Sequence, residues 1–83
     1  MSQGDIVGRV VEYVCKEIAE DAEAVTVEVI DDGDDRVVAE VHAAKPDMGR
    51  LIGRRGRVAR AIRTVASVAA EEEGLNAQVE FLD

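Results

Sequence analysis

Residues 46–65 of the chain read PDMGRLIGRRGRVARAIRTV, and this stretch decides the fold. Proline suits the first turn of a helix and glycine commonly ends one, so we expect a short helix over about residues 48–52 that stops at Gly53. Helical spacing of the apolar residues after Gly56 predicts a second, long helix to about Glu73. The two predicted helices therefore meet at Gly53-Arg54-Arg55-Gly56 with almost no loop between them.

The residues on either side of this stretch predict one more helix and three strands. Apolar residues at helical spacing predict a helix from about residue 3 to residues 20–22. From Val25 the apolar period changes to two, which predicts a hairpin: a strand to residue 30, an Asp- and Gly-rich turn, and a strand over 36–43. A last strand is expected over 76–82. The predicted order of elements is αββααβ.

This order predicts an α+β fold, a two-layer sandwich in which a three-stranded sheet carries three helices on one face. With 83 residues we expect a single domain over 1–83. We expect the long helix to turn an apolar stripe toward the core. The stripe is Val58, Ala61, Ile62, Val65, Ala66, Val68 and Ala69. We expect Asp47 to satisfy free N–H groups at the start of the short helix, and Cys15 to be a small core residue.

The distribution of charge favours an anionic ligand at one place only. The net charge of −8 argues against a nucleic-acid partner for the chain as a whole. However, no acid occurs between Asp47 and Glu71, and six of the ten basic residues lie in or beside that interval. They are Arg50, Arg54, Arg55, Arg57, Arg60 and Arg63. Because salt screens charges beyond about 8 Å, this local basic stripe decides where an anion docks.

The turn between the two predicted helices has the chemistry of a phosphate site. The first N–H groups of the long helix lack intrahelical partners, and its dipole is positive at that end. Glycine lets a sugar-phosphate backbone approach closely. We expect Arg54 and Arg55 to project into solvent, Arg57 and Arg60 to extend the positive track, and Arg50 to add charge from the preceding helix. From the residues alone, the alternative is an ordinary helix-to-helix turn with solvated arginines. For Arg63 a structural or solvated role is expected.

Residues 46–65 resemble the signature of KH domains, in which a [V/L]-I-G-x-x-G core joins two helices. The chain is most similar to small bacterial single-domain KH proteins of the KhpA type, over nearly its whole length. The resemblance implies the type II KH fold and binding of single-stranded RNA without strong sequence preference. It also implies a role as an RNA chaperone or post-transcriptional regulator, and an influence on cell shape. Homodimers, or heterodimers with a larger KhpB/Jag-like protein, are implied as well.

The resemblance assigns the RNA site to Gly53-Arg54-Arg55-Gly56, because KH loops grip the backbone of about four nucleotides. We expect Ile52, Val58 and Ala59 to contribute to an apolar groove for the bases. The chain departs from the family pattern in two ways. Both inner positions of the turn are arginine where one basic residue is usual, and the body is unusually acidic.

Other function classes find little support. One Cys and one His cannot form an internal disulfide or a Cys-based zinc site, so no metal is expected. Neither a catalytic set nor a nucleotide-binding motif is evident, and we expect no enzyme activity and no cofactor. No apolar run approaches the ~18 residues of a membrane span, and we expect a cytoplasmic protein. The second hypothesis is a protein-interaction module, using the apolar stripe of the long helix and a free sheet edge, with RNA binding secondary.

Overall fold

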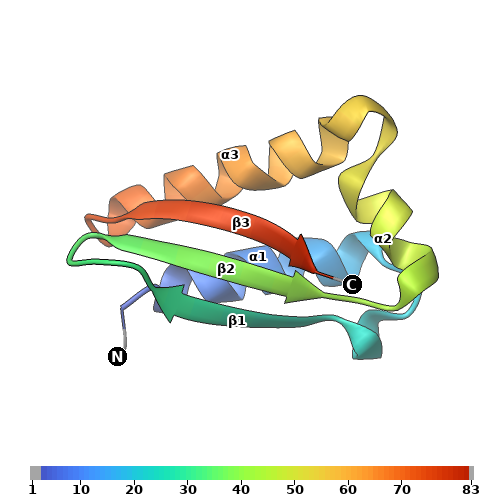
Figure 1. Cartoon of the computed structure of the whole chain (residues 1–83), viewed down its shortest axis with the longest axis horizontal. Coiled ribbons are helices and arrows are strands. Elements are labelled where there is room, and N and C mark those ends of the chain that lie inside the picture. Colours follow the sequence, from blue (N-terminus) through green and yellow to red (C-terminus); the bar gives the residue numbers. More distant parts are fainter. Residues whose placement is uncertain (1–2, 83) are drawn as a thin grey trace.

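The computed structural model describes residues 3–82 and contains three helices, three strands and two short 3-10 helices. The α+β class, the two layers and the order αββααβ are confirmed (Figure 1). In chain order the elements are α1 (Asp5–Ile18), a 3-10 turn (Ala22–Ala24), β1 (Thr26–Asp31), β2 (Arg36–His42), α2 (Lys45–Ile52), a second 3-10 turn (Arg54–Gly56), α3 (Arg57–Glu72) and β3 (Asn76–Leu82).

The sheet is mixed and has the order β1-β2-β3. The predicted hairpin is confirmed, because β1 and β2 pair antiparallel with Val29 opposite Ala39. Strand β3 pairs parallel to β2, with Val79 opposite Ala39. A parallel return needs a long crossover connection, and α2 and α3 provide it. Helices α1 and α3 cover one face of the sheet, and α2 continues the helical layer beyond the end of β2, packing against α3 and α1 (Figure 1).

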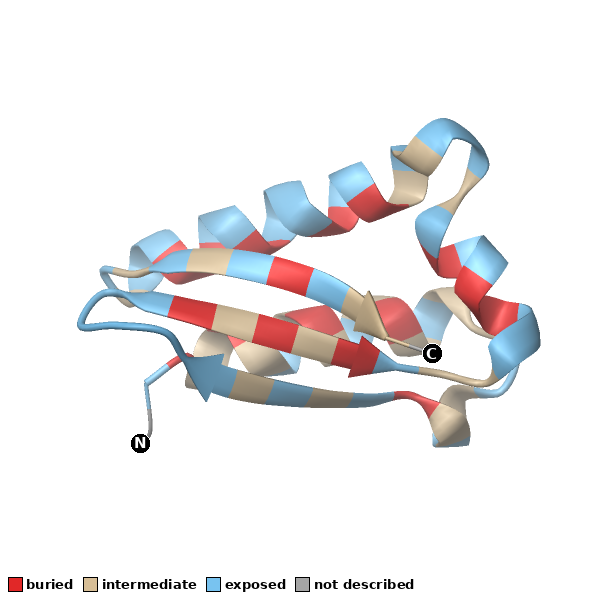
Figure 2. Cartoon of the chain, in the orientation of Figure 1, coloured by how far each residue is buried: buried red, intermediate tan, exposed pale blue. Residues whose placement is uncertain are grey.

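The core lies between this helical layer and the central strand. Strand β2 alternates buried and less buried residues, with Val37, Ala39 and Val41 facing the helices (Figure 2). Helix α1 adds Val7, Val11 and Cys15, at positions four residues apart. Burial raises the pKa of the Cys15 thiol to about 11, so the thiol stays protonated at neutral pH. Cys15 is thus the small apolar residue that its helical spacing predicts.

The predicted apolar stripe of α3 is wrong on one flank. The residues that α3 buries are Ala59, Ile62, Ala66, Ala69 and Ala70. Val65 is 40% exposed, Val68 is 60% exposed, and Ala61 also faces solvent. Apolar residues cover more than half the circumference of α3, so their spacing alone does not say which flank meets the sheet. The alanines form the inner flank, where their small side chains allow α3 to approach its neighbours closely.

Asp47 does not cap its own helix as expected. Ala44 is the N-cap residue of α2, and no side chain caps that end. The buried Asp47 carboxylate instead accepts hydrogen bonds from the backbone N–H groups of Glu20 (3.1 Å) and Asp21 (3.0 Å). These bonds, with a smaller contribution from the nearby Arg50 charge, lower the pKa of Asp47. They fasten α2 to the segment that follows α1, which ends at Ile18, earlier than expected.

A second long-range carboxylate holds the other end of α1. The Glu73 carboxylate accepts hydrogen bonds from the N–H groups of Gly4 (3.1 Å), Ile6 (3.0 Å) and Val7 (3.1 Å). The first N–H groups of a helix have no partner within it, so Glu73 supplies the cap that α1 lacks locally. Both ends of α1 are therefore tied to the half of the chain that carries α2 and α3.

Candidate nucleic-acid interface

Three of the four residues in the turn between α2 and α3 have positive φ. Gly53 has φ 75° and ψ 169°, Arg55 has φ 57° and ψ 24°, and Gly56 has φ 70° and ψ 19°. The Gly56 N–H donates a hydrogen bond to the Gly53 carbonyl (3.0 Å), which closes the turn. Arg55 is the only non-glycine residue with positive φ within residues 3–82. Left-handed backbone is costly for residues with a Cβ, so packing around the turn must hold Arg55 in this conformation.

The two glycines of the turn have different reasons to be glycine. A Cβ on Gly53 would lie 2.5 Å from Val58 Cγ2 and 2.9 Å from the Val58 backbone nitrogen. A Cβ on Gly56 would meet nothing within 4 Å. Gly53 is thus required by packing inside the protein, whereas Gly56 faces open space. The expected close approach of a ligand to the backbone is available at Gly56.

Four of the six arginines of the basic stripe are exposed and unpaired around this turn. Within residues 3–82, no carboxylate lies within 4.0 Å of the side-chain nitrogens of Arg54, Arg55, Arg57 or Arg60. All four side chains are exposed. Their charges therefore face solvent beside the positive end of the α3 dipole, as the sequence predicts.

Arg50 is placed differently from these four. Its guanidinium forms an ion pair with Glu20, and its Nε atom lies 3.6 Å from Asp47 Oδ1. The pairing turns Arg50 toward the end of α1. Its charge is thus already partly balanced, and Arg50 contributes less to the local positive potential than the other arginines.

The expected apolar groove is only partly present at the surface. Ile52 is 42% exposed at the end of α2, and Val58 is half-buried against Gly53. Ala59 is only 3% exposed, which corrects the expectation that it lines the groove. Its side chain lies on the inner flank of α3, so it has almost no surface to offer a base.

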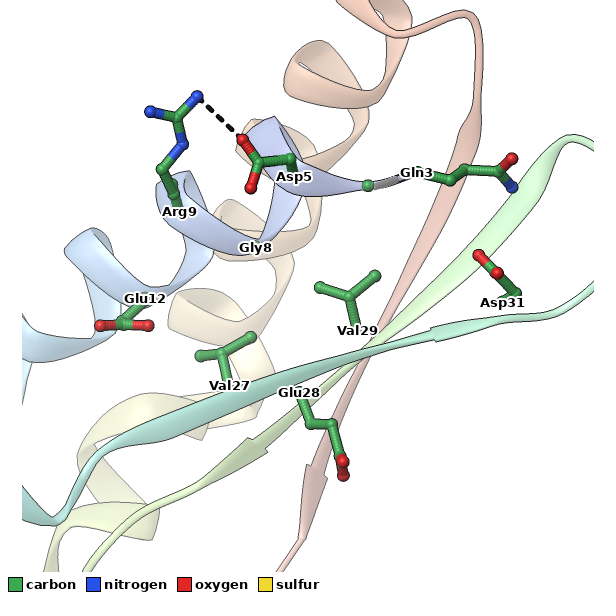
Figure 3. A pocket seen from close by; sticks show the side chains of 10 residues that line it. Gln3, Asp5, Gly8, Arg9, Glu12, Val27, Glu28, Val29 and Asp31 are labelled. Atoms are coloured by element: carbon green, nitrogen blue, oxygen red, sulfur yellow. Dashed lines mark ion pairs between the residues drawn. The ribbon is translucent and has the colours of Figure 1, made fainter. Parts of the chain in front are cut away.

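A pronounced hollow lies elsewhere, between the first half of α1 and β1 (Figure 3). Its volume is about 430 Å³. Val27 and Val29 point from β1 toward α1 and form its floor, and the rim is largely acidic. The acids of the rim are Asp5, Glu12 and Asp31, whereas the Glu28 side chain points away from α1 (Figure 3). The one cation among the lining residues, Arg9, is paired with Asp5 at 3.2 Å. This acidic rim repels phosphate, so the hollow does not suit a nucleic acid.

Two further classes of site are not found in the described chain. None of the helices within residues 3–82 has the length and apolar character that crossing a membrane requires. Nor does that part of the chain bring together three or more His, Cys, Asp or Glu side chains that could hold a metal ion.

Comparison with known proteins finds similar sequences over nearly the whole chain. The family model described as KhpA/KhpB, KH domain, matches residues 8–81. The chain is 36% identical over 73 residues to "RNA-binding protein KhpA" of Borreliella burgdorferi, covering 88% of each chain. It is 38% identical over 73 residues to the protein of that name from Clostridium perfringens, covering 87% of this chain and 95% of the relative. For the Aquifex aeolicus protein of that name, the identity is 32% over 74 residues, covering 89% and 92%.

Proposed function

Since the chain belongs to the KhpA/KhpB family of KH domains, we propose that it binds single-stranded RNA and grips the RNA backbone with Gly53-Arg54-Arg55-Gly56. The relatives reported above are named for RNA binding and not for catalysis, in keeping with a non-enzymatic role. We further propose that the domain spans residues 1–83 and acts in the cytoplasm as an RNA chaperone or post-transcriptional regulator.

The observation that carries this proposal is the exposed basic surface at the turn, whose arginines have no carboxylate partner within residues 3–82. Gly56 has free space where a Cβ would stand, so a sugar-phosphate backbone meets no steric barrier there. Arg54, Arg55, Arg57 and Arg60 surround this position without carboxylate partners in residues 3–82. Each phosphate that they neutralise releases counterions, which supplies most of the binding free energy in a sequence-independent way. Ile52 and Val58 provide apolar surface beside the turn, and Arg50 adds a weaker contribution through its long-range field.

The loop assignment is tested by reversing its charge. The double variant Arg54→Asp/Arg55→Asp should lose measurable binding to a fluorescent single-stranded RNA, while its circular dichroism spectrum stays unchanged. The matched control is Arg9→Asp/Arg36→Asp, which changes net charge equally but lies away from the turn. Equal loss of binding in both variants would show that RNA responds only to net charge. Undiminished binding in the loop variant would overturn the assignment.

A second candidate function, protein interaction, is favoured by the outer face of the helical layer. Val65 and Val68 are exposed on α3, and Tyr13 on α1 is 68% exposed. A hollow of about 340 Å³ adjoins Tyr13, lined by Ile6 and Val10. Because α1 and α3 pack side by side, these residues offer apolar surface of the kind found at protein interfaces. We propose a second copy of the chain, or a KhpB/Jag-like KH protein, as the partner.

This second function is tested by light scattering coupled to chromatography. A dimer mass that falls to the monomer mass in Val65→Glu/Val68→Glu supports the proposed surface. The matched control is Thr64→Glu/Ser67→Glu, which adds the same charge at neighbouring exposed positions of α3. A monomeric wild-type protein that also fails to bind a purified KhpB/Jag-like partner would refute this proposal.

A further inference from the structure

The row of arginines on α3 continues beyond the positions that face the turn. Arg57, Arg60 and Arg63 are three residues apart, and each helical residue adds about 100° of rotation. Successive members are therefore offset by about 60°, and the row winds around α3 toward one side. It ends against β3, where the Arg63 Nε–H donates a hydrogen bond to the Val79 carbonyl (3.3 Å). Helix α3 and strand β3 run beside each other in Figure 1.

At this point Arg63 meets the only phenylalanine of the chain. The central carbon of its guanidinium lies over the Phe81 ring, 5.6 Å from the ring centre. Such a placement is favourable because the face of an aromatic ring attracts cations. Strand β3 is an edge strand, paired only with β2 within residues 3–82. The pair thus stands at the open edge of the sheet and is not enclosed by a neighbouring strand.

The Arg63 guanidinium retains most of its binding capacity. It carries five N–H donors, of which the Nε–H alone has a partner within residues 3–82. No carboxylate of that part of the chain lies within ion-pair distance, although the chain has 18 acids. The centre of the cation lies over the Phe81 ring, and the Arg63 side chain is exposed. An exposed planar cation of this kind is a surface on which nucleobases stack.

We propose that Arg63 and Phe81 form a nucleobase subsite, in which an unpaired RNA base stacks on the exposed Arg63 guanidinium. This inference rests on the proposed RNA binding and adds a place where a base is bound in addition to phosphates. From Gly56 to Arg63 the helix rises by about 10 Å, which is within reach of the roughly four nucleotides that a KH loop holds. The Val79 hydrogen bond holds the guanidinium plane in position before the base arrives.

The test compares a base-bearing ligand with one that has no bases. The probes are an oligoadenylate and an abasic ribose-phosphate oligomer of equal length. Arg63→Lys keeps the charge but removes the flat surface, and it should weaken oligoadenylate binding about five-fold or more. Binding of the abasic oligomer should be unchanged. The matched control is Arg60→Lys, one turn earlier and without an aromatic neighbour, which should leave the ratio of the two affinities unchanged.

A spectroscopic signature separates stacking from a structural role. The fluorescent base 2-aminopurine replaces adenine at successive positions of the oligoadenylate. At one position, wild-type protein should quench its fluorescence more strongly than base stacking within the free strand does. Arg63→Lys and Phe81→Leu should each reduce that quenching. The subsite would be overturned if Arg63→Lys weakened binding of both oligomers equally. It would also be overturned if wild-type protein quenched 2-aminopurine at no particular position, and this second result does not depend on whether a variant folds.

The same experiment distinguishes the subsite from the proposed function on which it rests. If wild-type protein binds both oligomers and Arg54→Asp/Arg55→Asp binds neither, the RNA proposal stands whatever Arg63→Lys does. If wild-type protein binds neither oligomer, both the RNA proposal and the subsite are refuted.

Discussion

Replacing each glycine of the turn by alanine should separate stability from RNA binding. At Gly53 the new Cβ would lie 2.5 Å from Val58 Cγ2 and 2.8 Å from Val58 Cβ. The backbone there, at φ 75° and ψ 169°, is essentially restricted to glycine, and strain of this kind costs about 1–3 kcal/mol. Moving the Val58 side chain adds about 1 kcal/mol or more. We expect Gly53→Ala to lower the free energy of unfolding by about 3 kcal/mol.

At Gly56 the expected loss of stability is smaller because a Cβ there would meet no neighbouring atom within 4 Å. Left-handed backbone costs an alanine about 1–2 kcal/mol, but replacing glycine recovers about 0.5–1 kcal/mol by reducing the entropy of the unfolded chain. Gly56→Ala should therefore lose at most about 1.5 kcal/mol. Its methyl group points into the space where we place the RNA backbone, so its RNA affinity should fall although the protein stays folded.

Urea and thermal unfolding measure the stability of both variants, and fluorescence anisotropy of a labelled RNA measures their affinity for RNA. For a domain of this size 1 kcal/mol shifts the melting temperature by about 4–8 °C, so Gly53→Ala should melt at least about 12 °C below the wild type. Equal stabilities of the two variants would refute the packing argument at Val58. Full RNA affinity in Gly56→Ala would refute the approach of the backbone at that position.

Three further predictions follow from the carboxylates and the arginines. Backbone hydrogen bonds lower the pKa of Asp47 in the folded state, so its contribution is present above the unfolded pKa of about 3.9 and is lost as the pH falls below it. Melting temperatures between pH 7 and pH 3 should fall less steeply for Asp47→Asn than for the wild type; parallel curves would contradict this. Glu73→Gln should cost about 1–2 kcal/mol in urea unfolding because three N–H groups lose a charged acceptor, whereas exposed Glu72→Gln should cost nothing measurable. If the four unpaired arginines contact four phosphates, log affinity should fall with log salt with a slope of about 3; a slope near zero would exclude phosphate binding at the turn.

Local patterns predicted the elements of the fold, and most of their bounds, correctly. Alternation in 36–43 identified the central strand, and the glycines at positions 53 and 56 identified the break between α2 and α3. The flank of α3 could not be predicted, because Val65 and Val68 are as apolar as the residues that α3 buries. Only the position of the sheet relative to the helix decides between the two flanks.

In the candidate site, too, some features were predictable from local sequence and others depend on tertiary contacts. The arginines around the turn were predicted from sequence, because a local run of charge needs no tertiary information. The pairing of Arg50 with Glu20 and the role of Asp47 depend on contacts between positions 26 to 30 residues apart. Arg63 and Phe81 are likewise distant in sequence and meet only when β3 is in place. Which charges are neutralised and which ring lies under a cation are therefore properties of the assembled fold.

The bond between Glu73 and the start of α1 has a consequence for synthesis on the ribosome. Helix α1 cannot receive this cap until residue 73 has left the exit tunnel. The parallel pairing of β2 with β3, which brings Arg36 opposite Asn76, has to wait equally long. A nascent chain cut short before these residues holds α1 and the hairpin without their closing contacts, and it exposes the β2 edge to other chains. Folding of this domain is therefore completed only after Glu73 and strand β3 have left the ribosome.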